Sequence, residues 1–202
     1  MSAITKSAPS FSSVAVVGAA TMSCCSLGNV EVNLCRDAEA SGSLDLDFTQ
    51  SVWDLETLET TQRLGQHLVK HLPRGSILLL QGQLGAGKTS LVQGLAKACG
   101  ITEPITSPTF ALAQHYQDGN PPLIHLDLYR LEAPGSADEL FLQEEEEARA
   151  IGALMAVEWP ERLNLSLPEA WRLDITYAPS GGRSAKLHHP TLPMDAESKN
   201  SI

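Results

Sequence analysis

Apolar runs and stretches with helical spacing alternate through the middle of the chain. In residues 54–72, leucines recur three, four or six positions apart, which fits one buried face of a helix that Pro73 and Gly75 then end. Residues 77–80 form a continuous apolar run, which is typical of a strand covered on both faces. Helical spacing returns in residues 91–98. The order helix, strand, helix is therefore predicted for this part of the chain.

The second half of the chain continues the alternation. Apolar runs at residues 123–128 and 153–157 lie on either side of an acidic, helical stretch at residues 136–150. Residues 173–177 alternate between apolar and polar, and residues 184–187, beyond a Gly-Gly turn, can pair with them. Because strands that alternate with helices indicate a parallel sheet, we predict a three-layer α/β fold with a mostly parallel central sheet and a C-terminal β-hairpin.

The first 47 residues lack these patterns. They are rich in Ser, Ala and Gly and show no sustained period, so we predict that residues 1–47 form a disordered N-terminal extension. The absence of acidic residues before Glu31 is one mark of a transit peptide, but Lys6 is the only basic residue there and transit peptides are Arg-rich. Disorder, or a start codon assigned too early, is therefore favoured over a targeting role.

The other end of the chain is also polar. Residues 188–202 contain two prolines and no apolar period, so we predict a polar C-terminal tail in which His188 and His189 are solvated. The folded domain is then expected to span residues 48–187.

Composition narrows the range of partners. The 202 residues, 43% of them hydrophobic, suffice for one sizeable core. The 24 acidic and 14 basic residues give a net charge of −10, which opposes broad contact with DNA or RNA, so any role with nucleic acid should run through a partner. No apolar run is long enough to span a membrane, and the four cysteines lack the paired spacing of a zinc site. We expect a cytoplasmic protein with unpaired thiols that binds neither membrane nor DNA.

A phosphate-binding motif lies between the first predicted strand and the helix after it. Residues 82–89 read Gly-Gln-Leu-Gly-Ala-Gly-Lys-Thr and match the P-loop pattern G-x-x-x-x-G-K-[ST] in the required strand-to-helix context. Backbone N–H groups of such a loop point at phosphate oxygens, and the helix dipole adds positive potential there. Lys88 should reach the β and γ phosphates of ATP, and Thr89 should offer its hydroxyl to Mg²⁺. The fold is therefore predicted to be P-loop NTPase-like, with nucleotide contacts from Gly82, Gly85, Ala86, Gly87, Lys88, Thr89 and Ser90.

Two acids stand at the ends of predicted strands. Asp127 and Glu158 each follow an apolar run, so both carboxylates should emerge at the edge where open α/β folds bind ligands. P-loop enzymes need such acids to hold the metal, directly or through water, and to orient a nucleophile. The metal residues expected are thus Thr89, Asp127 and Glu158, although either acid alone could be an ordinary surface carboxylate. His125 should point the same way as Asp127, and we expect it to be packed or hydrogen-bonded.

A run of four glutamates at residues 144–147 offers a second candidate metal cluster. Consecutive residues on a helix point in different directions and mostly into water. We therefore interpret this run as a solvated face or a partner contact.

Four motifs occur in a family-specific order. The P-loop is followed by Ser107-Pro108-Thr109-Phe110, then by Asp127-Leu128-Tyr129-Arg130-Leu131, then by Val157-Glu158-Trp159-Pro160-Glu161. In this order, across residues 49–187, the chain resembles the TsaE family of bacterial ATPases. The resemblance implies a small P-loop ATPase needed to make threonylcarbamoyladenosine beside the anticodon of tRNAs that read codons beginning with A. Family members work with the TsaB and TsaD proteins, and because TsaD performs the transfer, the resemblance implies an accessory role with only indirect contact to tRNA.

The resemblance also implies roles for single residues. Asp127 stands in the Walker B position, Glu158 is a second acid of the metal site, and Thr109 resembles a switch threonine that senses the γ-phosphate. With Lys88, these residues make up the catalytic set. By the same resemblance, residues near the nucleotide are Thr61, beside the adenine, and Trp159 and Arg183. Many family members carry an acid where this chain has Gln83.

Other functions share a P-loop. A small-molecule or nucleoside kinase would need an acceptor pocket and usually an Arg-bearing lid, yet Arg130 and Arg149 are the only arginines between Phe110 and Val157. A GTPase would normally show an N-K-x-D sequence, which is absent. A non-catalytic binding module, in which ATP binding alone orders residues 107–110 for a partner, also remains open.

Overall fold

The computed structural model describes residues 51–133, 135–179 and 181–191. The expected N-terminal extension and most of the expected tail lie outside these residues. Within them the chain forms seven strands and three α-helices, and none of these helices is long and apolar enough to cross a bilayer. In chain order they are β1 (Val52–Leu55), α1 (Leu58–His71), β2 (Ile77–Gly82), α2 (Lys88–Ala98), β3 (Ala113–Tyr116), β4 (Leu123–Asp127), α3 (Ser136–Ile151), β5 (Leu154–Glu158), β6 (Trp171–Tyr177) and β7 (Arg183–His188), with a short 3₁₀ helix η1 (Pro160–Arg162) after β5.

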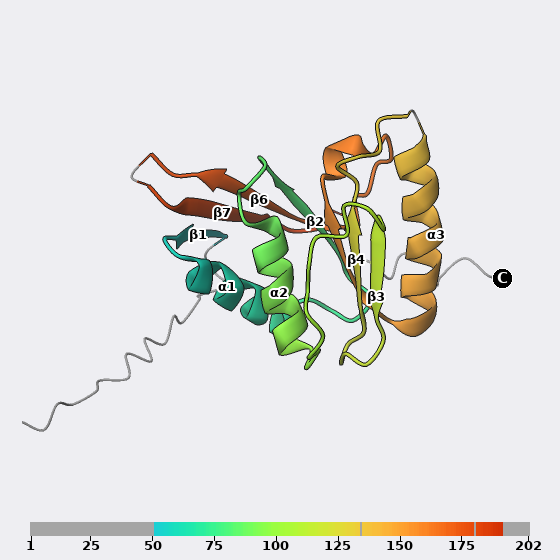
Figure 1. The fold of residues 1–202 in the computed structure, drawn as a ribbon, viewed down its shortest axis with the longest axis horizontal. Coiled ribbons are helices and arrows are strands. Elements are labelled where there is room, and N and C mark those ends of the chain that lie inside the picture. Colours follow the sequence, from blue (N-terminus) through green and yellow to red (C-terminus); the bar gives the residue numbers. More distant parts are fainter. Residues whose placement is uncertain (1–50, 134, 180, 192–202) are drawn as a thin grey trace, which may run out of the picture. The chain divides into compact units, whose positions relative to one another are not determined.

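The seven strands form one sheet in the order β1-β7-β6-β2-β5-β4-β3 (Figure 1). The four central strands β6, β2, β5 and β4 pair in parallel, while β7 is antiparallel to both β6 and β1, and β3 is antiparallel to β4. Five strands therefore run in one direction, and only β7 and β3 run against them. The predicted mostly parallel sheet and the C-terminal hairpin, β6–β7, are both confirmed.

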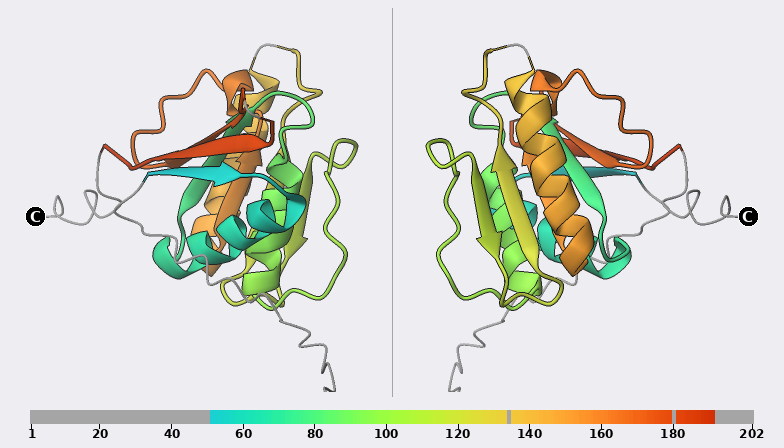
Figure 2. Two further views of the ribbon diagram at one scale, coloured as in Figure 1. Left: turned by 90° about the vertical axis from the view of Figure 1, so that its left-hand side faces the viewer. Right: turned by 90° about the vertical axis from the view of Figure 1, so that its right-hand side faces the viewer.

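Helices cover both faces of the sheet, as Figure 2 shows. Side chains alternate along each buried strand. On β5, for example, Leu154 and Ala156 belong to the apolar cluster that includes α1 and α2, whereas Met155 and Val157 belong to the cluster that includes α3. The continuous apolar runs in the sequence reflect this double coverage, and the predicted three-layer fold is confirmed.

Some element boundaries differ from the predicted ones. The first helix begins at Leu58, not residue 54, because Thr57 caps it: the Thr60 amide donates to the Thr57 hydroxyl at 3.1 Å, and the preceding residues form β1. Strand β7 continues through His188, whose imidazole lies 2.8 Å from a carboxylate oxygen of Asp174 on β6. The expectation of a solvated His188 was therefore wrong, because the antiparallel pairing extends one residue further.

Helices α1 and α2 approach each other through two glycines. A Cβ atom on Gly94 would lie 2.0 Å from the carbonyl oxygen of Gln62, and one on Gly65 would lie 2.3 Å from that of Leu91. No side chain fits at either position without moving a helix backbone. Because α2 begins with Lys88, this crossing also fixes the start of the helix that carries the P-loop lysine.

We predict that Gly94→Ala lowers the free energy of unfolding by about 1–3 kcal/mol, because the added methyl group overpacks the helix crossing. At an exposed helical position the same substitution would raise the free energy of unfolding, since Ala is a better helix former than Gly by about 1 kcal/mol. Urea unfolding followed by circular dichroism measures the change. Lys97→Ala, at an exposed position of the same helix, is the control and should stay within about 0.5 kcal/mol of the parent. A Gly94→Ala protein as stable as the parent would contradict the close approach.

Candidate nucleotide-binding site

The P-loop connects the end of β2 to the first residue of α2. Gly87 has a φ of 107°, in the left-handed region that favours glycine, and it immediately precedes the helix. A Cβ atom on Gly82 would lie 2.4 Å from the carbonyl oxygen of Ile175 on β6. These two glycines let the loop turn tightly against the neighbouring strand, so that the N-terminus of α2 faces the space above the sheet.

Lys88 is buried at this turn, with 4% of its surface exposed. Its Nζ donates to the carbonyl oxygens of Gly82 at 2.8 Å and Gln83 at 3.1 Å, and it lies 3.9 Å from the ring centroid of Trp159. Burial lowers the pKa of the ammonium group, while the negative charges of Glu158, Glu161 and Asp127 act in the other direction. A cation is thus held against the loop with little water around it, where an anion would bind strongly.

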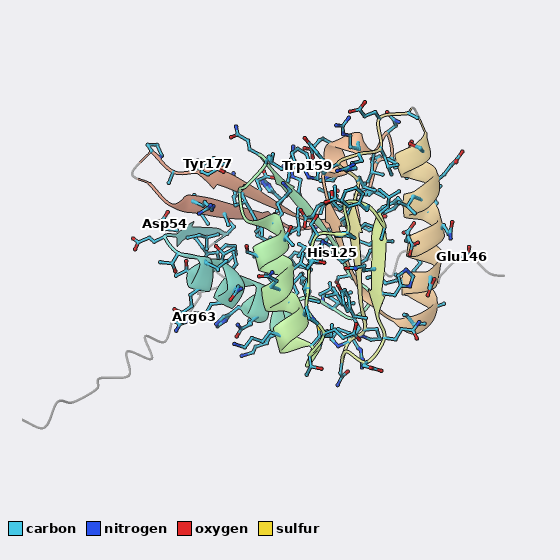
Figure 3. The ribbon with its side chains drawn as sticks, viewed as in Figure 1. Asp54, Arg63, His125, Glu146, Trp159 and Tyr177 are labelled. Carbon is cyan, nitrogen blue, oxygen red and sulfur yellow. The ribbon has the colours of Figure 1, made fainter. Side chains whose placement is uncertain are left out.

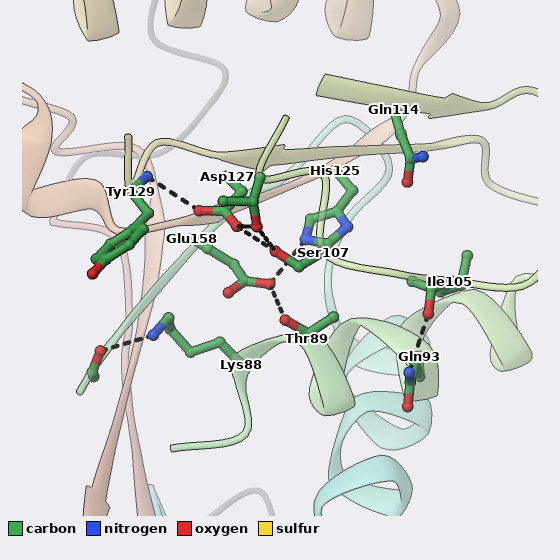
Figure 4. Close-up of polar contacts among 12 residues, drawn as sticks. Lys88, Thr89, Gln93, Ile105, Ser107, Gln114, His125, Asp127, Tyr129 and Glu158 are labelled. Atoms are coloured by element: carbon green, nitrogen blue, oxygen red, sulfur yellow. Dashed lines mark hydrogen bonds and ion pairs between the residues drawn. The ribbon is translucent and has the colours of Figure 1, made fainter. Parts of the chain in front are cut away.

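Glu158 joins three elements at the end of β5. Its Oε1 accepts a hydrogen bond from the Thr89 hydroxyl at 2.8 Å and lies 3.0 Å from Nε2 of His125 (Figure 4). Only 3% of its surface is exposed. Since β5 is the direct neighbour of β2 in the sheet, this carboxylate connects the P-loop helix to the strand beside it.

Asp127 serves a different loop. Its Oδ2 accepts hydrogen bonds from the hydroxyls of Ser107 and, at 3.1 Å, Thr109, and its Oδ1 accepts from the Tyr129 amide at 3.1 Å. The two hydroxyls lie 2.8 Å apart. The carboxylate therefore holds the segment that carries the predicted switch threonine.

A cleft of about 400 Å³ lies between these groups. It brings together nine predicted site residues, namely Gly85, Gly87, Lys88, Thr89, Ser90, Thr109, Asp127, Glu158 and Trp159, with Leu84, Ser107 and Tyr129 completing the lining. Ala86 is buried beneath the loop, and Gly82 lines a neighbouring cavity of about 710 Å³. Thr61 and Arg183 do not line this cleft but lie close to the loop, since a Cβ atom on Gly87 would be 3.6 Å from Thr61 Cγ2 and 3.8 Å from Arg183 Cδ.

The family model described as threonylcarbamoyl adenosine biosynthesis protein TsaE matches residues 55–185. The chain belongs to the TsaE family. This confirms the resemblance drawn from the four motifs.

Curated relatives and a solved structure agree with this family. Two proteins named tRNA threonylcarbamoyladenosine biosynthesis protein TsaE are similar to the chain. One, from a Nostoc species, is 46% identical over 130 residues, which cover 64% of this chain and 80% of that protein. The other, from a Synechocystis species, is 52% identical over 112 residues, which cover 54% of this chain and 69% of that protein. The crystal structure of Bacillus subtilis YdiB matches with a TM-score of 0.56 and 26% identity, covering 69% of this chain and 84% of that one.

Several contacts in this TsaE-family site carry no local sequence signal. Arg183 donates through Nη2 to the Gly85 carbonyl at 3.1 Å, and the Tyr177 hydroxyl lies 3.2 Å from the Leu84 carbonyl. Both side chains come from the C-terminal hairpin, where Figure 3 labels Tyr177. They hold the outer side of the P-loop, so the hairpin supports the site. The hydroxyl of Thr61, by contrast, donates to the Thr57 carbonyl of its own helix.

The sequence suggested that the glutamates at residues 144–147 on α3 form a solvated face or a partner contact. In the structure they are not all exposed to solvent. Glu146 points outward and is exposed (Figure 3), but Glu144 is 6% exposed and its Oε2 lies 2.6 Å from Nε2 of His115. Glu147 contacts the other ring nitrogen of His115 at 3.0 Å. The prediction was wrong for Glu144 because α3 packs against the sheet beside the edge strand β3, which carries this histidine.

We predict that Asp127→Ala speeds amide hydrogen exchange in residues 107–112 of the nucleotide-free protein by at least about tenfold, because the loop loses acceptors for the Ser107 and Thr109 hydroxyls. Hydrogen exchange followed by mass spectrometry measures this. Asp138→Ala is a suitable control, since its carboxylate accepts hydrogen bonds from Asn164 instead. Equal exchange of residues 107–112 in Asp127→Ala and the parent would show that the carboxylate does not hold this loop.

Proposed function

We propose that this chain is a Mg²⁺-dependent ATPase that supports threonylcarbamoyladenosine formation in tRNA by acting with the TsaD and TsaB proteins. The observation that carries the proposal is the convergence of a P-loop lysine and threonine with two buried carboxylates on one cleft, in a chain of the TsaE family. The predicted cytoplasmic location goes with this role.

The residues of the cleft fit a nucleoside triphosphate. The loop carries Gly82, where a Cβ atom would clash with β6, and Gly87, whose φ favours glycine. The N-terminus of α2 faces the cleft, and the Lys88 ammonium has only two carbonyl oxygens as hydrogen-bond partners in the described parts of the chain. Phosphate oxygens are stronger acceptors for a charged donor than carbonyl oxygens are. Lys88 would therefore turn from the loop carbonyls to the phosphates when ATP binds.

The oxygen donors of the site fit Mg²⁺. Thr89, Asp127 and Glu158 offer one hydroxyl and two carboxylates, the ligand type that Mg²⁺ prefers, directly or through water. When bound, Mg²⁺ would neutralise charge on the phosphates and favour attack by water. Glu158 keeps the threonine hydroxyl oriented, and either carboxylate can accept a hydrogen bond from the attacking water.

The loop that carries Thr109 provides a route to the partner proteins. Its hydroxyl contacts Asp127, and the next residue, Phe110, is 86% exposed with its ring 4.2 Å from the guanidinium carbon of Arg130. A γ-phosphate that attracts Thr109 would move Phe110 as well. In this proposal TsaD and TsaB respond to that movement. The acidic chain contacts tRNA only through them.

A second candidate function is a binding module that uses ATP without hydrolysing it. The observation that favours it is that both oxygens of Asp127 already accept hydrogen bonds, Oδ2 from the hydroxyls of Ser107 and Thr109 and Oδ1 from the Tyr129 amide, as a device for ordering a partner surface requires. Phosphate release in the presence of TsaD and TsaB separates the two functions. Nucleotide-dependent association without release of phosphate would support the module and contradict the ATPase.

We predict that Lys88→Ala weakens ATP binding by about 10- to 100-fold, because a charge-assisted contact contributes about 1.5–3 kcal/mol, and that it abolishes partner-stimulated hydrolysis. Its free energy of unfolding without nucleotide should not fall. Folding lowers the pKa of Lys88, so the charged lysine destabilises the fold. This cost is full below the folded-state pKa, falls as the pH rises through it, and is gone above the unfolded-state pKa. Replacing Lys88 removes this cost together with the two hydrogen bonds to the loop carbonyls, and the first change offsets the second.

Calorimetric ATP titration and urea unfolding of the same samples measure the two effects. Lys97→Ala is a matched control, because it removes an exposed lysine from the same helix. If Lys88→Ala binds ATP as tightly as Lys97→Ala does, the cleft is not the nucleotide site.

A further inference from the structure

His125 lies behind the site, and the proposed function assigns it no role. It lies on β4 with 0% of its surface exposed, and it does not line the cleft. Its only hydrogen-bond partner among the described residues is Glu158, 3.0 Å from Nε2, and Nδ1 has none there. A histidine placed only to fill space would not need its polar edge turned to a buried carboxylate.

The contact fixes the tautomer of the ring. A carboxylate accepts hydrogen bonds, so the imidazole nitrogen beside Glu158 Oε1 must carry the proton and donate. His125 is then protonated at Nε2. Its one donor is used by Glu158, and the ring has no route to a nucleotide in the cleft.

Both hydrogen-bond donors to Glu158 contact the same carboxylate oxygen. Thr89 and His125 both donate to Oε1, from opposite elements α2 and β4, and Figure 4 shows the other oxygen of the carboxylate pointing away from both, toward the side where Lys88 lies. A carboxylate without fixed donors can rotate about its last bond. Two donors on one oxygen stop this rotation and keep the second oxygen directed into the cleft.

From this arrangement we propose that His125 is a positioning residue for Glu158, which holds one carboxylate oxygen toward the metal or water of the site. The inference rests on the proposed function for the part Glu158 plays there. Thr89 cannot fill this role alone, because its hydroxyl is also the group expected to serve Mg²⁺. His125, enclosed behind the carboxylate, can donate to Glu158 throughout the cycle.

Nuclear magnetic resonance tests the contact without relying on hydrolysis. In protein labelled with ¹⁵N at histidine, His125 should show a proton on Nε2, none on Nδ1, and slow exchange with solvent, with His125→Leu assigning the signal. Glu158→Gln should move this proton resonance upfield, because a neutral amide is a weaker acceptor than a carboxylate. A ring protonated on Nδ1, or a signal that Glu158→Gln leaves in place, would overturn the proposal.

Two substitutions separate positioning from packing. His125→Gln keeps an N–H donor at a similar distance from the backbone, whereas His125→Leu fills the space without a donor. Positioning predicts that His125→Leu lowers kcat for partner-stimulated hydrolysis about tenfold with KM for ATP within about twofold of the parent, and that Gln restores most of the rate. The rates separate the two roles, and the free energy of unfolding does not, because His125→Leu removes both the unpaired Nδ1 and a donor to the buried Glu158 carboxylate.

A role in packing alone predicts the reverse order of rates, with Leu the better substitute. That result, or parental kcat in His125→Leu, would overturn the proposal. A parent chain that fails to hydrolyse ATP with TsaD and TsaB would contradict the ATPase function, and the resonance of the Nε2 proton would still decide whether His125 holds Glu158.

Discussion

The hydrogen bond between the Thr89 hydroxyl and the Glu158 carboxylate is the contact on which the rest of the site depends. It joins the first turn of α2 to the end of β5, and the two residues lie 69 positions apart in the sequence. Three features of the fold make it possible. The parallel order β2-β5-β4 places Glu158 beside the P-loop strand, the glycine crossing of α1 and α2 fixes the helix, and His125 on β4 supports the carboxylate from behind.

The two acids of the site have separate contacts, although the sequence gives them the same kind of position. Glu158 is tied to the P-loop threonine, whereas Asp127, one strand further away, is tied to the loop of residues 107–109. A ligand that displaces the Thr89 hydroxyl would therefore change the hydrogen bond to Glu158, and a ligand that displaces the Thr109 hydroxyl would change the hydrogen bond to Asp127. Such a division lets the contacts of the P-loop threonine and those of the loop of residues 107–109 change independently.

Much of this could be predicted from the sequence, because it depends on local chemistry. The P-loop is a continuous motif, and Asp127 and Glu158 follow apolar runs that a doubly covered parallel sheet requires. The remainder depends on contacts between distant residues. Nothing near Arg183 indicates that it bonds to Gly85, 98 positions earlier, and the burial of Glu144 follows from His115 on a strand too short to predict. Strand β1 was missed for the same reason, since four residues carry too little periodicity to compete with the helical spacing that follows.

Whether nucleotide chemistry in this cleft supports tRNA modification is tested most directly by the threonylcarbamoyladenosine content of tRNA in bacteria depleted of their own TsaE. Our account predicts that the parent chain restores the modified nucleoside and that Glu158→Gln, expressed to the same level and folded, does not. Restoration by Glu158→Gln equal to that by the parent would contradict it.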